Sequence, residues 1–188
     1  MKGIKKGFIS SLEKLYRKKI PPHQLITVDF GENLAELSYE INKEIAVIIN
    51  RRGQVINVTI GDANSVKLGK FKNVREGKAR LCGLRCIHTH PSGTPELSKA
   101  DTTALEQNRF DVMACISVNP ASTFSKKQGE TVRFADSITT AFLIPEKDEN
   151  GNNYRTLSVM TLRQAAADDF TAFLETIEQD FAQRAEAE

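Results

Sequence analysis

Two stretches, 7–18 and 32–42, repeat hydrophobic residues at the spacing of three and four positions that gives a helix one apolar face. The apolar positions are Phe8, Ile9, Leu12, Leu15 and Tyr16 in the first stretch and Leu34, Leu37 and Ile41 in the second. Pro21-Pro22 follows the first stretch, and proline stops a helix because it lacks an N–H and clashes with the preceding turn. The pattern predicts two amphipathic helices.

The hydrophobic pattern then changes to that of strands. Residues 45–49 (IAVII) form a continuous apolar run with β-branched members, and residues 54–60 alternate between two faces. The intervening Asn50-Arg51-Arg52-Gly53 has the composition of a turn. These features predict a buried strand joined to its neighbour as a hairpin.

The rest of the chain alternates between strand-like and helix-like segments. The predicted elements are strands at 81–89 and 112–118, a helix at 98–110 with Ser98 as its N-cap, short strands at 141–144 and 157–160, and a closing helix from Thr161 to about 184. The basic segment 65–79 has no clear period, which predicts a long loop. This order predicts an α/β fold with a mixed β-sheet flanked by helices.

Length and composition are consistent with one domain over residues 1–188, with a core at about 32–160. The chain has 188 residues, of which 40% are hydrophobic and 27% charged, enough to bury a full core. No apolar run is long enough to cross a bilayer, and the N-terminus is amphipathic rather than signal-like. We therefore expect a cytoplasmic protein with no membrane partner.

Three cysteines, Cys82, Cys86 and Cys115, fall within apolar strand-like segments. Because they are an odd number in a chain large enough to fold without disulfides, we interpret them as reduced core residues. Cys86 lies two residues before His88 and so shares its strand face. Packing is the favoured interpretation of Cys86, with lining of a site as the alternative.

The net charge is only +2, but basic residues gather in segments 2–19 and 67–80. Such segments could contact RNA phosphates. Solvated surface is the favoured interpretation, because no aromatic side chains interleave with the charges to stack on bases. His23, in a proline-rich turn, is interpreted as a surface or capping residue.

The candidate chemistry lies in residues 87–101, IHTHPSGTPELSKAD. His88 and His90 are two apart in a predicted strand, so both side chains project from one face, about 7 Å apart at Cα. Asp101 lies in the first turn of the following helix and can turn back toward them. Two histidines and a carboxylate, with a fourth position for water, are a typical catalytic zinc set. Zinc lowers the pKa of its bound water to about 7 and polarises a carbonyl group.

Each part of this pattern also has an ordinary structural explanation. A buried strand histidine is usually just hydrogen-bonded, and Ser98 with Asp101 forms a capping box of the S-x-x-D kind. The combination of both within fifteen residues favours a metal site over packing alone.

His88-Thr89-His90-Pro91, six residues and then Ser98-Lys99-Ala100-Asp101 resemble the JAMM motif, H-[ST]-H-P-x6-S-x-x-D, of zinc isopeptidases and of bacterial RadC proteins. The resemblance implies a cytidine-deaminase-like architecture, a zinc ion held by His88, His90 and Asp101, and a protein or peptide substrate. It also implies that Glu44 is the general acid/base and that Ser98 supports the oxyanion. Taken without the resemblance, Glu44 is a charged residue at a helix–strand junction.

A second resemblance covers about residues 36–118. LSYEINKEIAVIINRRGQVINVTIGD, RLCGLRCIHTHPSGTPELSKADTTAL and RFDVMACISV are similar to the N-terminal extension of clostridial-type HflX GTPases, which are ribosome-associated. The chain has no G-x-x-x-x-G-K-[ST] phosphate loop, so we expect no GTPase activity of its own. The alternative function is therefore a non-catalytic accessory module, with the ribosome or an HflX-like GTPase, separate or fused, as partner.

Overall fold

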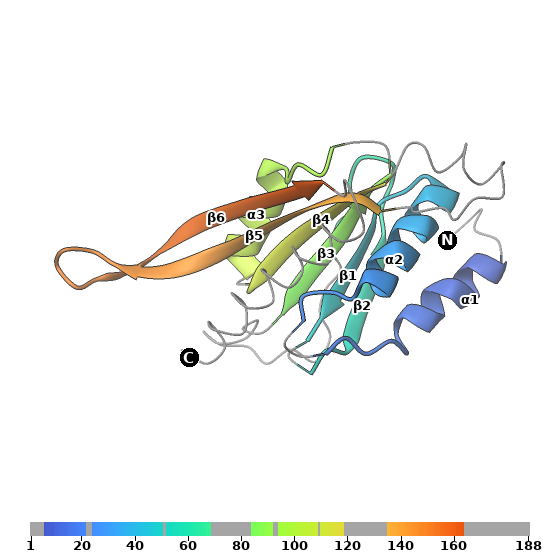
Figure 1. The fold of residues 1–188 in the computed structure, drawn as a ribbon, viewed down its shortest axis with the longest axis horizontal. Coiled ribbons are helices and arrows are strands. Elements are labelled where there is room, and N and C mark those ends of the chain that lie inside the picture. Colours follow the sequence, from blue (N-terminus) through green and yellow to red (C-terminus); the bar gives the residue numbers. More distant parts are fainter. Residues whose placement is uncertain are drawn as a thin grey trace.

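The computed structural model describes residues 6–21, 24–50, 52–68, 84–91, 94–108, 110–118 and 135–163. Over these residues the chain is an α/β domain with a six-stranded sheet (Figure 1). The strands are β1 (Ile45–Ile49), β2 (Val55–Ile60), β3 (Arg85–His90), β4 (Val112–Val118), β5 (Ala135–Lys147) and β6 (Asn153–Arg163), and the helices are α1 (Lys6–Leu15), α2 (Val28–Ile41) and α3 (Lys99–Asn108). The strand order is β2-β1-β3-β4-β5-β6. Since β3 and β4 run parallel and the other neighbours antiparallel, the predicted mixed sheet is confirmed.

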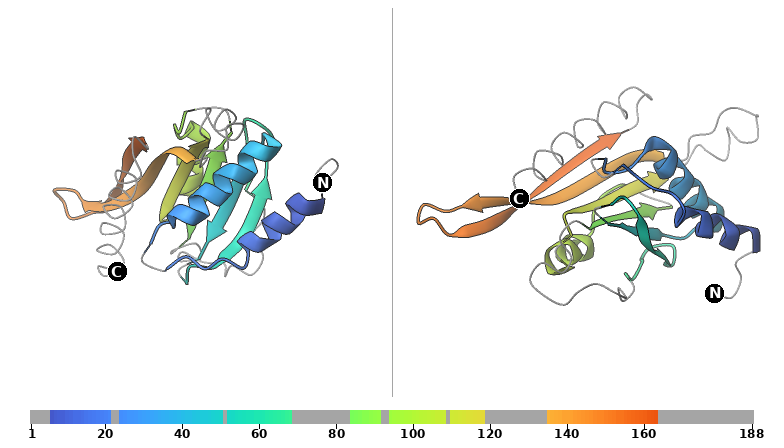
Figure 2. Two further views of the ribbon diagram at one scale, coloured as in Figure 1. Left: turned by 45° about the vertical axis from the view of Figure 1, so that its right-hand side comes forward. Right: turned by 90° about the horizontal axis from the view of Figure 1, so that it is seen from below.

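Helix α2 covers one face of the sheet, and α1 lies on the same side (Figures 1 and 2). The α2 helix begins after Thr27, whose hydroxyl accepts a hydrogen bond from the N–H of Phe30, and it ends at Asn42 in the left-handed conformation. It therefore starts four residues before the predicted 32–42 segment, because the Thr27 cap adds a first turn. Its buried apolar residues pack on alternate residues of the central strands.

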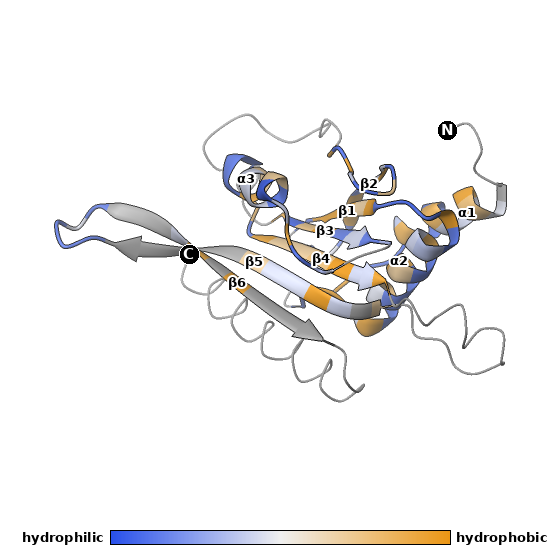
Figure 3. Cartoon of the chain, turned by 90° about the horizontal axis from the view of Figure 1, so that it is seen from above, coloured by the Kyte–Doolittle hydropathy of each residue, from blue (hydrophilic) through white to orange (hydrophobic). Residues whose placement is uncertain are grey.

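Helix α3 lies on the opposite face of the sheet (Figures 2 and 3). Of its residues only Leu105 is buried. A smaller apolar cluster lies beneath it, made of Ile48, Leu84, Cys86, Leu105, Phe110, Met113 and Ala141. This face of the sheet consequently has room for side chains that are not part of an apolar core.

The last two strands form a hairpin that extends beyond the rest of the sheet (Figure 1). The short strands predicted at 141–144 and 157–160 are the middles of β5 and β6, whose paired length is 11 residues on β6. Thr161, Leu162 and Arg163 pair with β5, so the prediction that a helix starts at Thr161 is wrong. Pairing with β5 therefore extends into the start of the apolar series from which the helix was predicted, and the remainder of that predicted helix lies outside the described residues.

The other predicted elements agree with the structure apart from their ends. The strands 45–49 and 112–118 are observed with the predicted bounds, and the helix predicted at 98–110 is α3. Of the predicted loop 65–79, residues 65–68 carry no helix or strand, and the rest lies outside the described residues. Among the helices that the structure describes, none is both long and apolar enough to span a membrane.

Candidate metal centre

The two histidines of the motif lie on β3 and face α3. Strand side chains alternate between faces, so Ile87 joins the apolar core beneath α2 while His88 and His90 point to the other side. The ring centroids of His88 and His90 are 5.0 Å apart, with an angle of 62° between the ring planes. The predicted convergence of the two imidazoles is therefore observed.

Strand pairing brings further residues to the histidines from both sides. In the antiparallel β1/β3 pair, Ala46 lies opposite His88, and continuing this register by two residues places Glu44 beside His90. In the parallel β3/β4 pair, His88 lies beside Cys115. The site thus lies across β1, β3 and β4, and the first turn of α3 covers it.

His88 is the most deeply buried of the three predicted ligands, and one of its ring nitrogens has no hydrogen-bond partner. The residue is 2% exposed, and Nε2 is a buried atom without a hydrogen-bond partner. The ring also forms a hydrogen bond with the Ala114 backbone, which must engage Nδ1 because Nε2 is unpartnered. Nε2 lies 3.6 Å from Oδ1 of Asp101. A buried nitrogen without a partner costs free energy, and an ion between these two atoms would satisfy it.

His90 repeats this arrangement at the edge of the site. Its Nδ1 lies 2.9 Å from the carbonyl oxygen of Thr94, and because a carbonyl only accepts, Nδ1 carries the proton. The lone pair of Nε2 then faces Oε1 of Glu44, 3.8 Å away. Metal-binding histidines usually donate one ring N–H to a backbone carbonyl or carboxylate, which fixes the tautomer and leaves the other nitrogen for the ion. Both histidines satisfy that requirement.

Burial sets the protonation of His88. Removal from water lowers its pKa to about 4, and the neighbouring Asp101 carboxylate opposes this shift without reversing it. The imidazole is therefore neutral at pH 7, with a free electron pair on Nε2. A neutral imidazole is the form that binds a metal ion.

Asp101 serves the helix cap and the site at the same time. Its Oδ2 accepts hydrogen bonds from the Ser98 N–H (2.8 Å) and the Ser98 hydroxyl (2.6 Å), while its own N–H donates to Ser98 Oγ (3.2 Å). The predicted capping box is therefore present. The second carboxylate oxygen, Oδ1, faces His88, so the capping interpretation and the ligand interpretation are compatible.

Glu44 lies just before β1 and is 5% exposed. Its N–H donates to the carbonyl of Asp62 (2.7 Å), and its own carbonyl accepts from the N–H of Gly61 (2.9 Å). Burial raises the pKa of this carboxyl, the nearby His90 lowers it, and the negative charges of Asp101 and Asp62 raise it further, with a net shift upward. A buried carboxyl whose pKa is shifted toward neutrality is suited to accepting and returning a proton.

A chain of buried hydroxyl groups on the α2 side holds the backbone on both sides of Glu44. The Ile45 N–H donates to Thr89 Oγ1 (3.0 Å), the Thr89 hydroxyl donates to Ser38 Oγ (2.7 Å), and the Ser38 hydroxyl donates to the carbonyl of Lys43 (2.7 Å). Thr89 is the residue between the two histidines. Helix α2, β1 and β3 are thereby joined directly behind the site, which fixes the position of Glu44.

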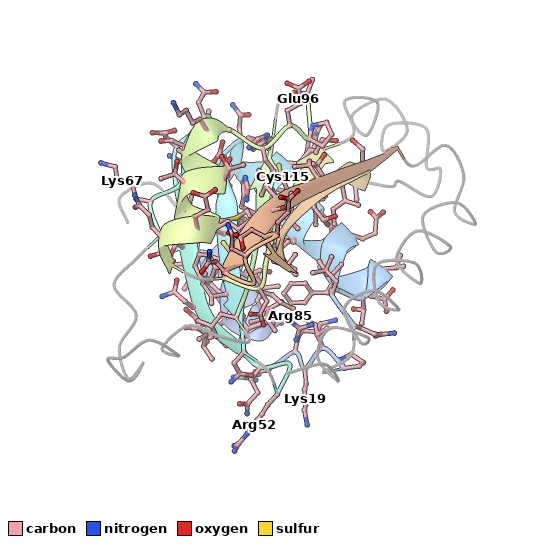
Figure 4. The ribbon with its side chains drawn as sticks, turned by 90° about the vertical axis from the view of Figure 1, so that its left-hand side faces the viewer. Lys19, Arg52, Lys67, Arg85, Glu96 and Cys115 are labelled. Carbon is pink, nitrogen blue, oxygen red and sulfur yellow. The ribbon has the colours of Figure 1, made fainter. Side chains whose placement is uncertain are left out.

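The structure adds one residue that sequence reasoning placed in the core. The ligand atoms of His88, His90 and Cys115 all lie within 4.8 Å of one another, a group of three compatible with a metal ion. Figure 4 shows Cys115 in the interior beside α3, whereas Lys19 and Arg52 point outward. Alternation along residues 112–118 predicts which side chains share a face of that strand. The sequence does not predict the strand pairing that places Cys115 beside His88.

Two of the remaining predictions can be compared with the described residues. Cys86 packs in the apolar cluster beneath α3, which agrees with its interpretation as a core residue. In the first basic segment, Lys14, Arg17, Lys18 and Lys19 are exposed, which agrees with a solvated surface. His23, Cys82 and most of the segment 67–80 lie outside the described residues.

Comparisons of the chain with protein-family models, with curated proteins and with solved structures found no match. Functional inference therefore depends on the geometry of this centre and on the motif that forms it.

Proposed function

We propose that this chain is a zinc-dependent hydrolase of amide or isopeptide bonds, similar in its chemistry to the JAMM metalloproteases. The observation that carries the proposal is the unpartnered Nε2 of His88, which is buried within reach of Asp101 Oδ1 and next to the His90 ring. Nitrogen and carboxylate donors of this kind are suited to zinc. His88, His90 and Asp101 would hold the ion.

Zinc bound there supplies Lewis acidity, which makes water ionise near neutral pH and polarises a carbonyl group. Glu44 performs the proton transfer in this proposal: its carboxylate takes a proton from the attacking water and passes it to the nitrogen of the leaving amine. Its position 3.8 Å from His90 keeps it next to the metal ligands. Its raised pKa reduces the free-energy difference between its two protonation states at neutral pH.

Ser98 orients Asp101 through two hydrogen bonds to Oδ2, which leaves Oδ1 for the metal. The role of Ser98 in supporting the oxyanion stays a prediction from the JAMM resemblance. For that role its hydroxyl would turn away from Asp101 toward the substrate carbonyl.

Metal analysis and a hydrolysis assay on the same preparations test the proposal. We expect about one zinc per chain, lost in His88→Ala and in Asp101→Ala. The substrate panel consists of fluorogenic peptide amides and lysine ε-linked isopeptides. In Glu44→Gln we expect the zinc to remain and the rate of hydrolysis to fall by about a hundredfold to ten-thousandfold, the usual range for loss of a general acid/base.

Glu96→Gln is the matched control, because Glu96 is an exposed glutamate (Figure 4) in the segment of chain that joins β3 to α3. It should leave both zinc content and rate unchanged. A wild-type chain that binds no zinc, or a Glu44→Gln variant as active as wild type, would contradict the proposal. Stable zinc binding with no hydrolysis of any substrate in the panel would instead favour the accessory-module function.

A further inference from the structure

We propose that Cys115 supplies a sulfur ligand to the metal centre, together with the imidazoles of His88 and His90. This inference rests on the proposed metal site and changes its chemistry, since the motif by itself provides only nitrogen and oxygen donors. It gives the site a preference for metals that bind thiolate.

The first support is the position of the sulfur. Cys115 lies directly beside His88 in the parallel β3/β4 pair, and its Sγ is within 4.8 Å of ring nitrogens of both histidines. Ligand atoms around one tetrahedral zinc ion, with metal–ligand distances of about 2.0–2.3 Å, lie about 3.3–3.8 Å apart, so side-chain shifts of about an ångström would bring these three atoms to one ion. The second support is independent of the cysteine: the buried Nε2 of His88 has no hydrogen-bond partner.

A comparison with Cys86 separates this sulfur from an ordinary core cysteine. Both residues point to the α3 face of the sheet and both are buried, at 1% exposure for Cys86 and 0% for Cys115. Cys86 belongs to the apolar cluster beneath α3. Cys115 belongs to neither apolar cluster of the described residues, and its strand neighbours are His88 and Thr139. Its strand neighbours are therefore polar, whereas those of Cys86 are Ile48 and Met113.

The place of Asp101 is consistent with a sulfur ligand. Among the described residues, the compact group of three ligand atoms contains Cys115 rather than Asp101, and Asp101 is already held by Ser98 through one oxygen. In this proposal His88, His90 and Cys115 form the inner set and Asp101 Oδ1 completes the shell from α3, so the attacking water would take the fifth position to which catalytic zinc can expand. On binding, the thiol loses its proton to solvent and the sulfur donates an electron pair to the cation. Thiolate favours zinc over magnesium, calcium or manganese.

Cobalt(II) is the probe for the sulfur ligand, because it occupies zinc sites and gives an intense near-ultraviolet charge-transfer band only when bound to thiolate. We expect this band when the wild-type chain is titrated with cobalt(II). It should disappear in Cys115→Ser, and zinc affinity should fall by at least about tenfold to hundredfold, the loss that removal of a mere supporting group already causes. Cys86→Ser is the matched control and should keep the band and the affinity.

X-ray absorption of the wild-type zinc form tests the same point without any substitution. A zinc–sulfur distance of about 2.3 Å should accompany nitrogen or oxygen ligands at about 2.0–2.2 Å. Metal binding with neither sulfur signal would overturn the role of Cys115 and leave the His88, His90 and Asp101 site of the proposed function standing. Failure of the wild-type chain to bind either zinc or cobalt(II) would overturn both.

Discussion

The two faces of the central sheet use the same strands for different purposes. Toward α2, the alternate positions of β1, β3 and β4 are nearly all aliphatic, and the buried charge on that side, Arg85, donates to the carbonyls of Gln24, Leu25 and Asn50. Toward α3, the same strands carry His88, His90 and Cys115.

The difference lies in which groups the buried polar side chains face. The guanidinium of Arg85 is held by three carbonyl oxygens, which ties the segment before α2 to the sheet. On the other face the Nε2 of His88 faces the Asp101 carboxylate, 3.6 Å away, beside the His90 ring, and the covering helix α3 buries a single residue. A functional site commonly lowers the stability of a protein, and the rest of the fold compensates for that loss. We infer that the α2 face stabilises the fold and that the α3 face is arranged for binding an ion.

The largest stability effect should therefore come from the α2 face. Phe30 lies on α2 and is 0% exposed. Phe30→Ala should lower the free energy of unfolding by about 3–5 kcal/mol, because it leaves a large cavity. Denaturant unfolding of the metal-free protein measures this. Asp101→Asn, on the other face, should lower the free energy of unfolding much less. An equal loss in the two variants would contradict the inference that the α2 face stabilises the fold.

Lowering the pH should reduce the free energy of unfolding by about 3 kcal/mol, because of His88 on the α3 face. The pKa of His88 is about 4 in the folded chain against 6.5 as its ordinary value, which corresponds to about 3 kcal/mol. As pH falls from 6.5 to 4, the unfolded chain binds a proton that the folded chain does not, so stability is lost over that window. Unfolding of metal-free protein across this range measures the loss. In His88→Gln that contribution should be absent, and an unchanged pH dependence in this variant would count against the buried neutral imidazole.

A smaller effect should connect the two faces. Thr89→Val keeps the shape of the side chain but removes the hydroxyl between Ile45 N–H and Ser38, which should cost about 1–3 kcal/mol because a buried N–H loses its partner. It should also slow hydrolysis with zinc content unchanged, since Glu44 is held by this chain.

Thr59→Val provides the comparison for that experiment, because within the described part of the chain the Thr59 hydroxyl bonds only to the nearby Asn57 side chain on the β2 edge. This variant should cost less than Thr89→Val, because Thr59 is half-buried and its hydroxyl satisfies no backbone N–H. Equal effects of the two threonine changes would mean that the hydroxyl chain behind the site does not position Glu44.

Local pattern was sufficient for the parts of the site that lie within one strand and one helix turn. The spacing of two between His88 and His90 fixes a common face in any strand, and Ser98 with Asp101 forms its capping box from a spacing of three. Local pattern was misleading at residues 161–163: Leu162 begins a series of apolar residues at helical spacing, yet these three residues pair with β5.

The positions of Glu44 and Cys115 beside the histidines could not be predicted from the sequence pattern alone. From their own surroundings, one is a charged residue at a junction and the other a cysteine in an apolar strand. Their roles depend on which strands are neighbours and in what register, and β1, β3 and β4 are joined by segments whose length does not specify that pairing. Side-chain alternation is a local property of the backbone, so the sequence alone determines the two faces of each strand. Strand pairing depends on contacts across the whole fold, so only the tertiary structure decided that a carboxylate and a thiol meet the two imidazoles.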